Sequence, residues 1–203
     1  MLLVVLLGMV GCSSTSKNPH MIQSPAATGK KTVAVMAVDQ RAMTAKKTVT
    51  PDHLGEVGGA FGNPFTLTTE KRTAVSVDLT ESLTEGFRRG GWRTAPASAV
   101  ATLTKEAAFR NLQTHGADRF LIVALKNWES DTLASTNFRF DLEVSVLDAN
   151  GQVLAVERVQ GQQNLGYPKY GRLSETIRAA MDAESSRVLS TALAKPALVA
   201  ALR

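Results

Sequence analysis

Three segments of the chain have the hydrophobic patterns that are typical of β-strands. Thr32–Val38 (TVAVMAV) and Arg119–Trp128 (RFLIVALKNW) are short and mostly apolar, which predicts strands that are buried on both faces. Phe138–Leu147 (FRFDLEVSVL) alternates apolar and polar residues, which predicts a strand with one solvated face. These segments provide the core of a β-sheet.

A hairpin is expected after the third of these strands. Asp148-Ala149-Asn150-Gly151 suits a type I turn followed by a glycine in the left-handed region, and Val153–Gln160 supplies the returning strand. The register that keeps apolar partners together places Val144 opposite Val156 and Val146 opposite Leu154. The chain therefore predicts an antiparallel pair in this region.

Helical periods separate and follow the strands. Val75, Leu79, Leu83 and Phe87 recur every four residues and predict a helix that Thr68 or Thr69 caps and that Gly90-Gly91 terminate. Ser98 is expected to cap a second helix, which carries Val100, Leu103, Ala107, Ala108 and Leu112 and closes at His115-Gly116. A long helix is expected over roughly Arg172–Ala194, followed by Pro196 and a short apolar tail.

Two glycine-rich stretches lack either period. Ala42–Thr69 has glycine at 55, 58, 59 and 62, and we expect a loop of unusual length. Gly161–Gly171 predicts a second irregular connection. The expected order is therefore β-α-β-α-β-β-β-α, an α+β two-layer sandwich of a mostly antiparallel sheet with packed helices.

The amino-terminal segment points to export from the cytoplasm. Leu2–Val10 is almost wholly apolar but is about half the roughly 20 residues that a spanning helix needs. It fits the apolar region of a secretory signal, although no Lys or Arg precedes it. The alternatives are an ordinary secretory signal with an incidental cysteine and a poorly ordered amino terminus.

Met9-Val10-Gly11-Cys12 resembles the lipobox of bacterial lipoproteins, with Met9 in place of the usual Leu. The resemblance implies that residues 1–11 are a cleaved signal, that Cys12 carries acyl chains such as palmitate, and that residues 12–31 are a flexible tether to one periplasmic domain over 32–203. Ser13, rather than Asp, implies the outer membrane as destination. Cys12 is the sole cysteine, so no internal disulfide forms.

Charge and chemistry exclude several classes of function. The net charge is +5, but Lys and Arg are scattered and only 5% of residues are aromatic, which argues against nucleic-acid binding. The three histidines are His20 in the tether, His53 in the long loop and His115 at a helix end, where complementing the helix C-terminus is favoured over acting as a base. No zinc spacing and no phosphate-binding glycine motif occurs in the sequence. Asp141 and Glu143 share one strand face with Arg139 and fit a solvated surface. We expect no enzyme activity, no catalytic residue, no metal and no cofactor.

Three features are candidates for binding. Asp39 and Arg41 flank Gln40 at the end of a buried strand, and a local ion pair that pins the following loop is the favoured interpretation. Trp128, near Phe138, is expected where two strands end, either as packing or as a ligand shelf. Tyr167 and Tyr170 lie in a Gly/Pro loop, where exposed aromatics often contact partners.

Two family resemblances concern larger parts of the chain. His115–Val123 contains Gly116-Ala117-Asp118 followed by an apolar strand. This arrangement resembles a short motif of periplasmic α/β modules of the TolB amino-terminal and CsgG-like type. The chain also resembles the YajG-type bacterial lipoproteins, through the lipobox, Val38-Asp39-Gln40-Arg41, Gly90-Gly91-Trp92 and Asn150-Gly151, followed by a long carboxy-terminal helix. Gly55–Phe65 has no place in that pattern. The YajG resemblance implies an envelope lipoprotein with no assigned reaction.

The sequence thus predicts an outer-membrane lipoprotein that faces the periplasm. Its domain is expected to bind another envelope protein as a structural or assembly accessory. The alternative is a tethered module that binds a lipid, glycan or peptide. A flat exposed sheet edge would favour the first role, and a deep apolar pocket beneath Ala42–Thr69 would favour the second.

Overall fold

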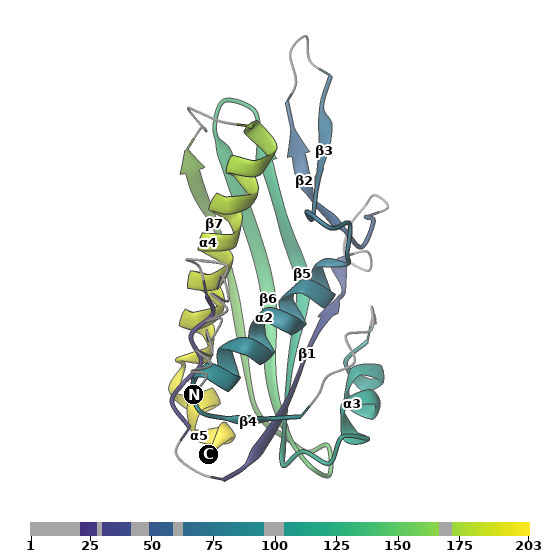
Figure 1. Ribbon diagram of the computed structural model, residues 1–203, viewed down its shortest axis with the longest axis vertical. Coiled ribbons are helices and arrows are strands. Elements are labelled where there is room, and N and C mark those ends of the chain that lie inside the picture. Colours follow the sequence, from purple (N-terminus) through teal and green to yellow (C-terminus); the bar gives the residue numbers. More distant parts are fainter. Residues whose placement is uncertain (1–20, 28–29, 42–48, 59–62, 96–103, 167–171) are drawn as a thin grey trace, which may run out of the picture.

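The structure, a computed structural model, describes residues 21–27, 30–41, 49–58, 63–95, 104–166 and 172–203 (Figure 1). One sheet and a set of helices make up this part of the chain. In chain order the elements are β1 (Thr32–Asp39), β2 (His53–Val57), β3 (Phe65–Thr68), α2 (Val75–Arg89), β4 (Arg93–Thr94), α3 (Lys105–Gln113), β5 (Arg119–Thr132), β6 (Thr136–Asp148), β7 (Val153–Gly166), α4 (Leu173–Leu193) and α5 (Pro196–Leu202). The predicted α+β class is confirmed.

β5 organises the sheet, because it pairs with three strands. β6 runs antiparallel to it from Arg119↔Asp148 to Thr132↔Thr136. On its other edge β5 pairs in parallel with β1 along its first half and with β2 near its end. β1 and β2 therefore lie one after the other along the same edge of β5, and β4 and β3 extend the sheet beyond them. The two longest ladders, β5–β6 and β6–β7, are antiparallel.

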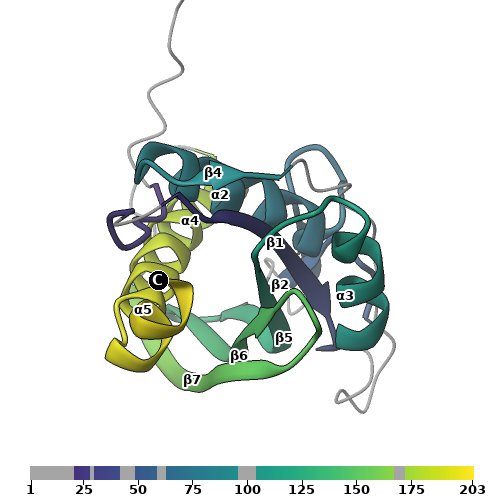
Figure 2. The same cartoon turned by 90° about the horizontal axis from the view of Figure 1, so that it is seen from below.

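The sheet is curled, and helices lie on both of its faces (Figure 2). The larger core lies between the sheet and α2, α4 and α5, and the smaller core lies beneath α3. β1 contributes to both: Val33, Val35 and Ala37 enter the larger core, and the alternate residues Ala34, Met36 and Val38 enter the smaller one. This explains why β1 is apolar at every position from Val33 to Val38 instead of alternating.

The segment Ala42–Thr69 was expected to be one long loop, and this expectation is wrong. Residues 53–57 and 65–68 form β2 and β3, an antiparallel pair. The hairpin escaped the sequence pattern because Gly55 and a register shift beside it interrupt the period of two. The second expected irregular connection, Gly161–Gly171, is likewise strand up to Gly166, and residues 167–171 lie outside the described part.

The hairpin after Asp148 forms as predicted, but its register differs. Gly151 has a φ of +84°, and its N–H donates to the Asp148 carbonyl over 3.1 Å, as in the predicted turn. Val144 pairs with Glu157 and Val146 pairs with Ala155. The predicted Val144–Val156 and Val146–Leu154 pairs are wrong, because a register shift between Val146 and Leu147 moves β7 along by one residue.

Strand and helix ends also differ in detail. β5 continues past Trp128 to Thr132. Ala74, not Thr68 or Thr69, is the N-cap of α2, and Thr104 caps α3 through a 3.1 Å bond from the Ala107 N–H to its Oγ1. Ser98, the predicted cap, lies outside the described residues. The stripe of four apolar residues on α2 is buried as predicted, and the apolar tail after Lys195 forms α5.

Part of the predicted tether packs against the domain. Ile22 is buried in the larger core, and the Gln23 N–H donates to Ser190 Oγ on α4. Trp92 Nε1 donates to the carbonyl of Pro25 over 2.6 Å. Residues 21–27 therefore pack on α2 and α4, which differs from the flexible tether expected up to residue 31.

Candidate functional site

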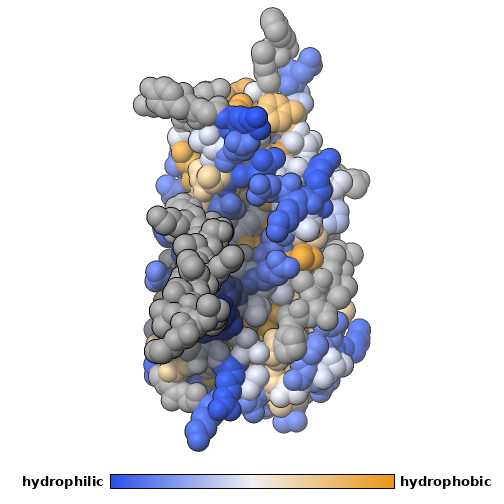
Figure 3. Space-filling view, in the orientation of Figure 1, coloured by the Kyte–Doolittle hydropathy of each residue, from blue (hydrophilic) through white to orange (hydrophobic). Residues whose placement is uncertain are grey.

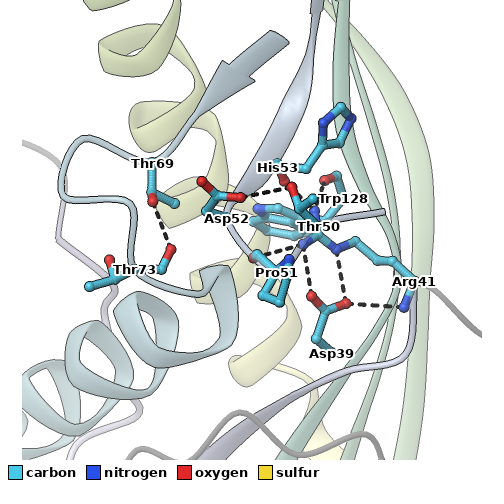
Figure 4. Close-up of polar contacts among 9 residues, drawn as sticks. All are labelled: Asp39, Arg41, Thr50, Pro51, Asp52, His53, Thr69, Thr73 and Trp128. Carbon is cyan, nitrogen blue, oxygen red and sulfur yellow. Dashed lines mark hydrogen bonds and ion pairs between the residues drawn. The ribbon is translucent and has the colours of Figure 1, made fainter. Parts of the chain in front are cut away.

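Arg41 lies at the point where β1 ends and β2 begins (Figure 4). Its Nε and Nη2 donate to the two carboxylate oxygens of Asp39 over 2.9 and 2.7 Å. Its Nη1 donates to the carbonyls of His53 and Trp128, and Nη2 also donates to the carbonyl of Pro51 over 3.2 Å. All five guanidinium N–H groups therefore have acceptors within the protein.

This geometry follows from the topology of the sheet. β1 pairs with β5 as far as Leu125, and β2 resumes the pairing at Ser130. Between them β5 has a register shift, and the carbonyl of Trp128 receives no strand partner from that edge. Arg41 supplies the missing donor. The predicted local ion pair with Asp39 is present, and it pins the segment that leads into β2.

Trp128 lies within β5, which continues beyond it to Thr132, and not at a strand end as expected. Its side chain is 2% exposed, and its ring meets that of Phe138 edge-on at a centroid distance of 5.0 Å. Packing is therefore the main role of this indole. One part of it also lines a groove.

That groove has a volume of about 600 Å³ and lies between α2 and α4. Its apolar lining comes from Ile22, Leu54, Val75, Leu79, Trp128 and Met181. Its carboxylates, from Glu70, Asp78, Glu81, Glu175 and Asp182, outnumber its cations, Lys71 and Arg178. Hydrophilic residues predominate on the surface between α4 and the start of α2 (Figure 3). The groove is thus an acidic rim over an apolar floor, and the sequence did not predict it.

β7 forms one edge of the sheet, on the far side of β6 from β5. Among the described residues β7 pairs with β6 alone, over a length of 14 residues. Every residue from Gln160 to Asn164 is exposed. Val153, Leu154 and Val156, near its start, are exposed apolar residues. β7 therefore provides an exposed sheet edge, the feature that favours docking of a protein partner, and it also contacts α4 and α5.

The acidic residues on the outer face of β6 are engaged in ion pairs. Glu143 accepts from Lys105 over 2.6 Å and from Lys126 over 2.7 Å, and these bonds hold the pKa of its carboxyl below the ordinary 4.5. The hydrogen bonds from Arg158 lower the pKa of Asp141 in the same way. A general acid needs a raised pKa, so neither carboxyl is suited to that role. No cluster of metal-ligating residues occurs in the described ranges.

Three predicted site residues lie outside the described part of the chain: Cys12, Tyr167 and Tyr170. Their proposed roles remain predictions. Asp39, Arg41 and Trp128 come together around one interruption of the sheet. No helix within the described ranges combines the length and hydropathy that a membrane span requires.

No family model and no curated protein matches the chain. Several solved structures are similar over most of its length. Protein XCC0632 from Xanthomonas campestris, of family DUF330, is 13% identical with a TM-score of 0.48, over 90% of this chain and 92% of that one. PelC from Paraburkholderia phytofirmans, a dodecamer, is 16% identical with a TM-score of 0.45, over 89% and 92%.

Lipoprotein GNA1162 from Neisseria meningitidis is 10% identical with a TM-score of 0.42, over 76% of this chain and 98% of that one. All three TM-scores lie below 0.5. Membership of the YajG-type family stays a prediction from the sequence motifs.

Proposed function

We propose that this protein is a lipid-anchored protein of the bacterial envelope whose domain docks an extended segment of another envelope protein along β7. It acts by binding rather than by catalysis, as a structural or assembly accessory. The observation that carries the proposal is the edge of β7.

An unpaired sheet edge offers a row of backbone N–H and C=O groups to another strand. Proteins that avoid such pairing place Lys, Pro or other charges on the edge, or cover it. Val159–Gly166 contains none of these residues, and Gln160–Asn164 is exposed throughout. Addition of a strand from a partner would satisfy the edge and give affinity through main-chain hydrogen bonds.

The anchor completes the proposal. Cys12 follows an apolar run and Gly11, in the arrangement that lipoproteins use for acylation. More than one acyl chain gives stable membrane attachment, at about 0.8 kcal/mol for each buried methylene. With Ser13 after the cysteine, the protein resides at the outer membrane and faces the periplasm.

The docking role is tested by adding charge to the edge. Gln160→Lys with Gln162→Lys places two cations on exposed positions of β7, whereas Gln113→Lys with Thr191→Lys adds the same charge to exposed positions on α3 and α4. We expect crosslinking in intact envelopes to join a partner to the wild type and to the helix variant, and the edge variant to lose it. Equal recovery of the same partner by both variants would refute docking at β7.

The anchor is tested separately through Cys12→Ser. We expect this variant to lose palmitate labelling and to leave the membrane fraction. Unchanged labelling and fractionation would show that the protein is not a lipoprotein, without bearing on the edge.

The groove between α2 and α4 favours a second candidate function, a tethered ligand-binding module. Its apolar floor and excess of carboxylates suit a cationic peptide better than a neutral glycan. Native mass spectrometry of the protein purified from envelopes tests this role. A bound small molecule or peptide, with no crosslinked protein partner, would favour the groove over the β7 edge.

A further inference from the structure

A second cavity lies on the outer face of the sheet, between α3 and the β6–β7 hairpin. Its volume is about 350 Å³, near the lower end of ligand pockets. It is lined by Lys105, Glu106, Phe109, Arg110, Ile122, Ser145, Leu147, Gly151 and Val153. None of these residues belongs to the groove between α2 and α4 or to the edge segment Gln160–Asn164.

The apolar part of this cavity is held rigidly. The Phe109 ring meets that of Phe120 edge-on, with centroids 5.1 Å apart, and lies against Gly151, where a Cβ would come within 2.9 Å of it. Ile122 is fully buried and Leu147 is nearly so. Val153 remains 53% exposed. The cavity is therefore preformed, and one of its apolar walls is open to solvent.

Ser145 is a polar residue in this apolar lining. It is 2% exposed, and its Oγ is buried with no hydrogen-bond partner in the described structure. A buried hydroxyl without a partner costs about 1–3 kcal/mol, so such groups are rare and call for an explanation. A ligand in the cavity that offers a hydroxyl would provide the missing bond.

The mouth of the cavity is formed by charged residues of α3. Lys105 is already engaged by Glu143 at 2.6 Å. Arg110 is exposed and forms no ion pair within the part of the chain that is described, and Glu106 lies one turn before it on the same helix face. Arg110 is thus the cation available to an anionic group at the mouth, and Glu106 opposes such a group.

We propose that this cavity binds a medium-chain aliphatic carboxylate that carries a hydroxyl on its chain. The chain lies against Phe109, Leu147 and Val153, its hydroxyl bonds to Ser145 Oγ, and its carboxylate lies at Arg110. This binding site goes beyond the docking role of β7 and does not depend on it.

The test measures equilibrium binding of labelled decanoate and of a set of monohydroxylated decanoates that differ in hydroxyl position. The full-length acylated protein is used in nanodiscs, and binding to empty nanodiscs is subtracted. We expect one hydroxydecanoate to bind about fivefold more tightly than decanoate, the worth of one net hydrogen bond. In Ser145→Ala this preference disappears while decanoate binding stays unchanged.

Variants of the two charged residues at the mouth are expected to change the affinity for carboxylates in opposite directions. Arg110→Gln weakens binding of every carboxylate about threefold to fivefold, and Glu106→Gln tightens it about twofold. Arg88→Gln, which removes the same charge from α2, leaves binding unchanged. Ser145→Ala should be at least as stable as the wild type, because it removes an unpartnered hydroxyl. The proposal is overturned if no probe binds above the empty nanodiscs, or if Ser145→Ala and Arg110→Gln bind every probe like the wild type.

Discussion

Arg41 and Asp39 form a buried ion pair that joins two strands end to end along one edge of β5. The side chain of Arg41 is 4% exposed. It donates to the Asp39 carboxylate at the end of β1, to the His53 carbonyl at the start of β2 and to the Trp128 carbonyl of β5 between them. A side chain here does the hydrogen bonding that a continuous strand would otherwise do. The stability of the β2–β3 hairpin should therefore depend on one guanidinium group.

Replacement of Arg41 tests this dependence. Arg41→Met leaves the Asp39 carboxylate buried without its cation and removes the donors to Pro51, His53 and Trp128. We expect the free energy of unfolding to fall by about 3–5 kcal/mol. Arg41→Lys keeps the charge but has only three donors, so it should recover part of the loss. Denaturant unfolding gives these values, and hydrogen exchange shows whether amides of β2 lose protection first.

A lysine variant as stable as the wild type, with full protection of β2, would contradict the joining role. Such a result would mean that the ion pair alone, without the fork of donors, is sufficient.

Gly55 permits the close contact between β2 and β5. Its φ is +145°, and a Cβ there would lie 2.0 Å from the backbone oxygen of Ser130. Gly55→Ala should therefore push the strands apart and cost about 3 kcal/mol or more in unfolding free energy. Gly166→Ala is the matched control, since its φ is +74° but nothing lies within 4 Å, and it should cost about 1 kcal/mol. If thermal unfolding gives the same loss of stability for both alanine variants, the close contact between Gly55 and Ser130 does not contribute to the cost.

Thr80 on α2 provides a hydrogen-bond acceptor for a backbone N–H of β1. Its Oγ1 accepts from the Ala37 N–H over 2.9 Å and donates to the Ser76 carbonyl over 2.7 Å. Thr80→Val leaves that buried N–H without a partner, so we expect a loss of about 1–3 kcal/mol, which Thr80→Ser largely restores. Thr84→Val removes a similar bond within α2, to the Thr80 carbonyl, and should stay within about 0.5 kcal/mol. The expectation fails if both valine variants unfold at the same denaturant concentration.

Glu143 makes the stability of the fold sensitive to acid. Hydrogen bonds from Lys105 and Lys126 lower its pKa in the folded state below the ordinary 4.5. The unfolded chain thus binds the proton more readily, and the stabilisation is complete above about pH 4.5 and is lost as pH falls through the folded-state pKa. We expect Glu143→Gln to lower stability at neutral pH by about 1 kcal/mol and to flatten the acid limb of the stability profile.

Glu81→Gln provides the comparison, because Glu81 is exposed and has no ion pair within the described ranges. An acid limb of the same slope in the wild type and in Glu143→Gln, measured by denaturant unfolding at each pH, would rule out Glu143 as its source.

Several elements could be predicted from the sequence because their signals are local. The buried strand β1, the apolar stripe of α2 and the glycine turn at Gly151 each depend on residues a few positions apart, and all are present. The pairing of Arg41 with Asp39 is local as well, since the two residues are separated by one position at a strand end. The envelope location inferred from Cys12 also rests on its immediate neighbours alone, and it stays a prediction.

Tertiary structure decided the rest, because those features depend on which distant segments meet. Gly55 interrupts the strand pattern of β2 in the sequence, and its reason is the carbonyl of Ser130, 75 positions away on β5. The polar run Gln160–Asn164 has no apolar alternation to mark it as a strand, yet pairing with β6 extends it into an exposed edge. The cavity at Ser145 exists only where α3 crosses the hairpin. The sequence by itself determined the class of fold and many of its local elements. The β7 edge, the groove between α2 and α4 and the cavity at Ser145 all arise from long-range packing, which local patterns do not encode.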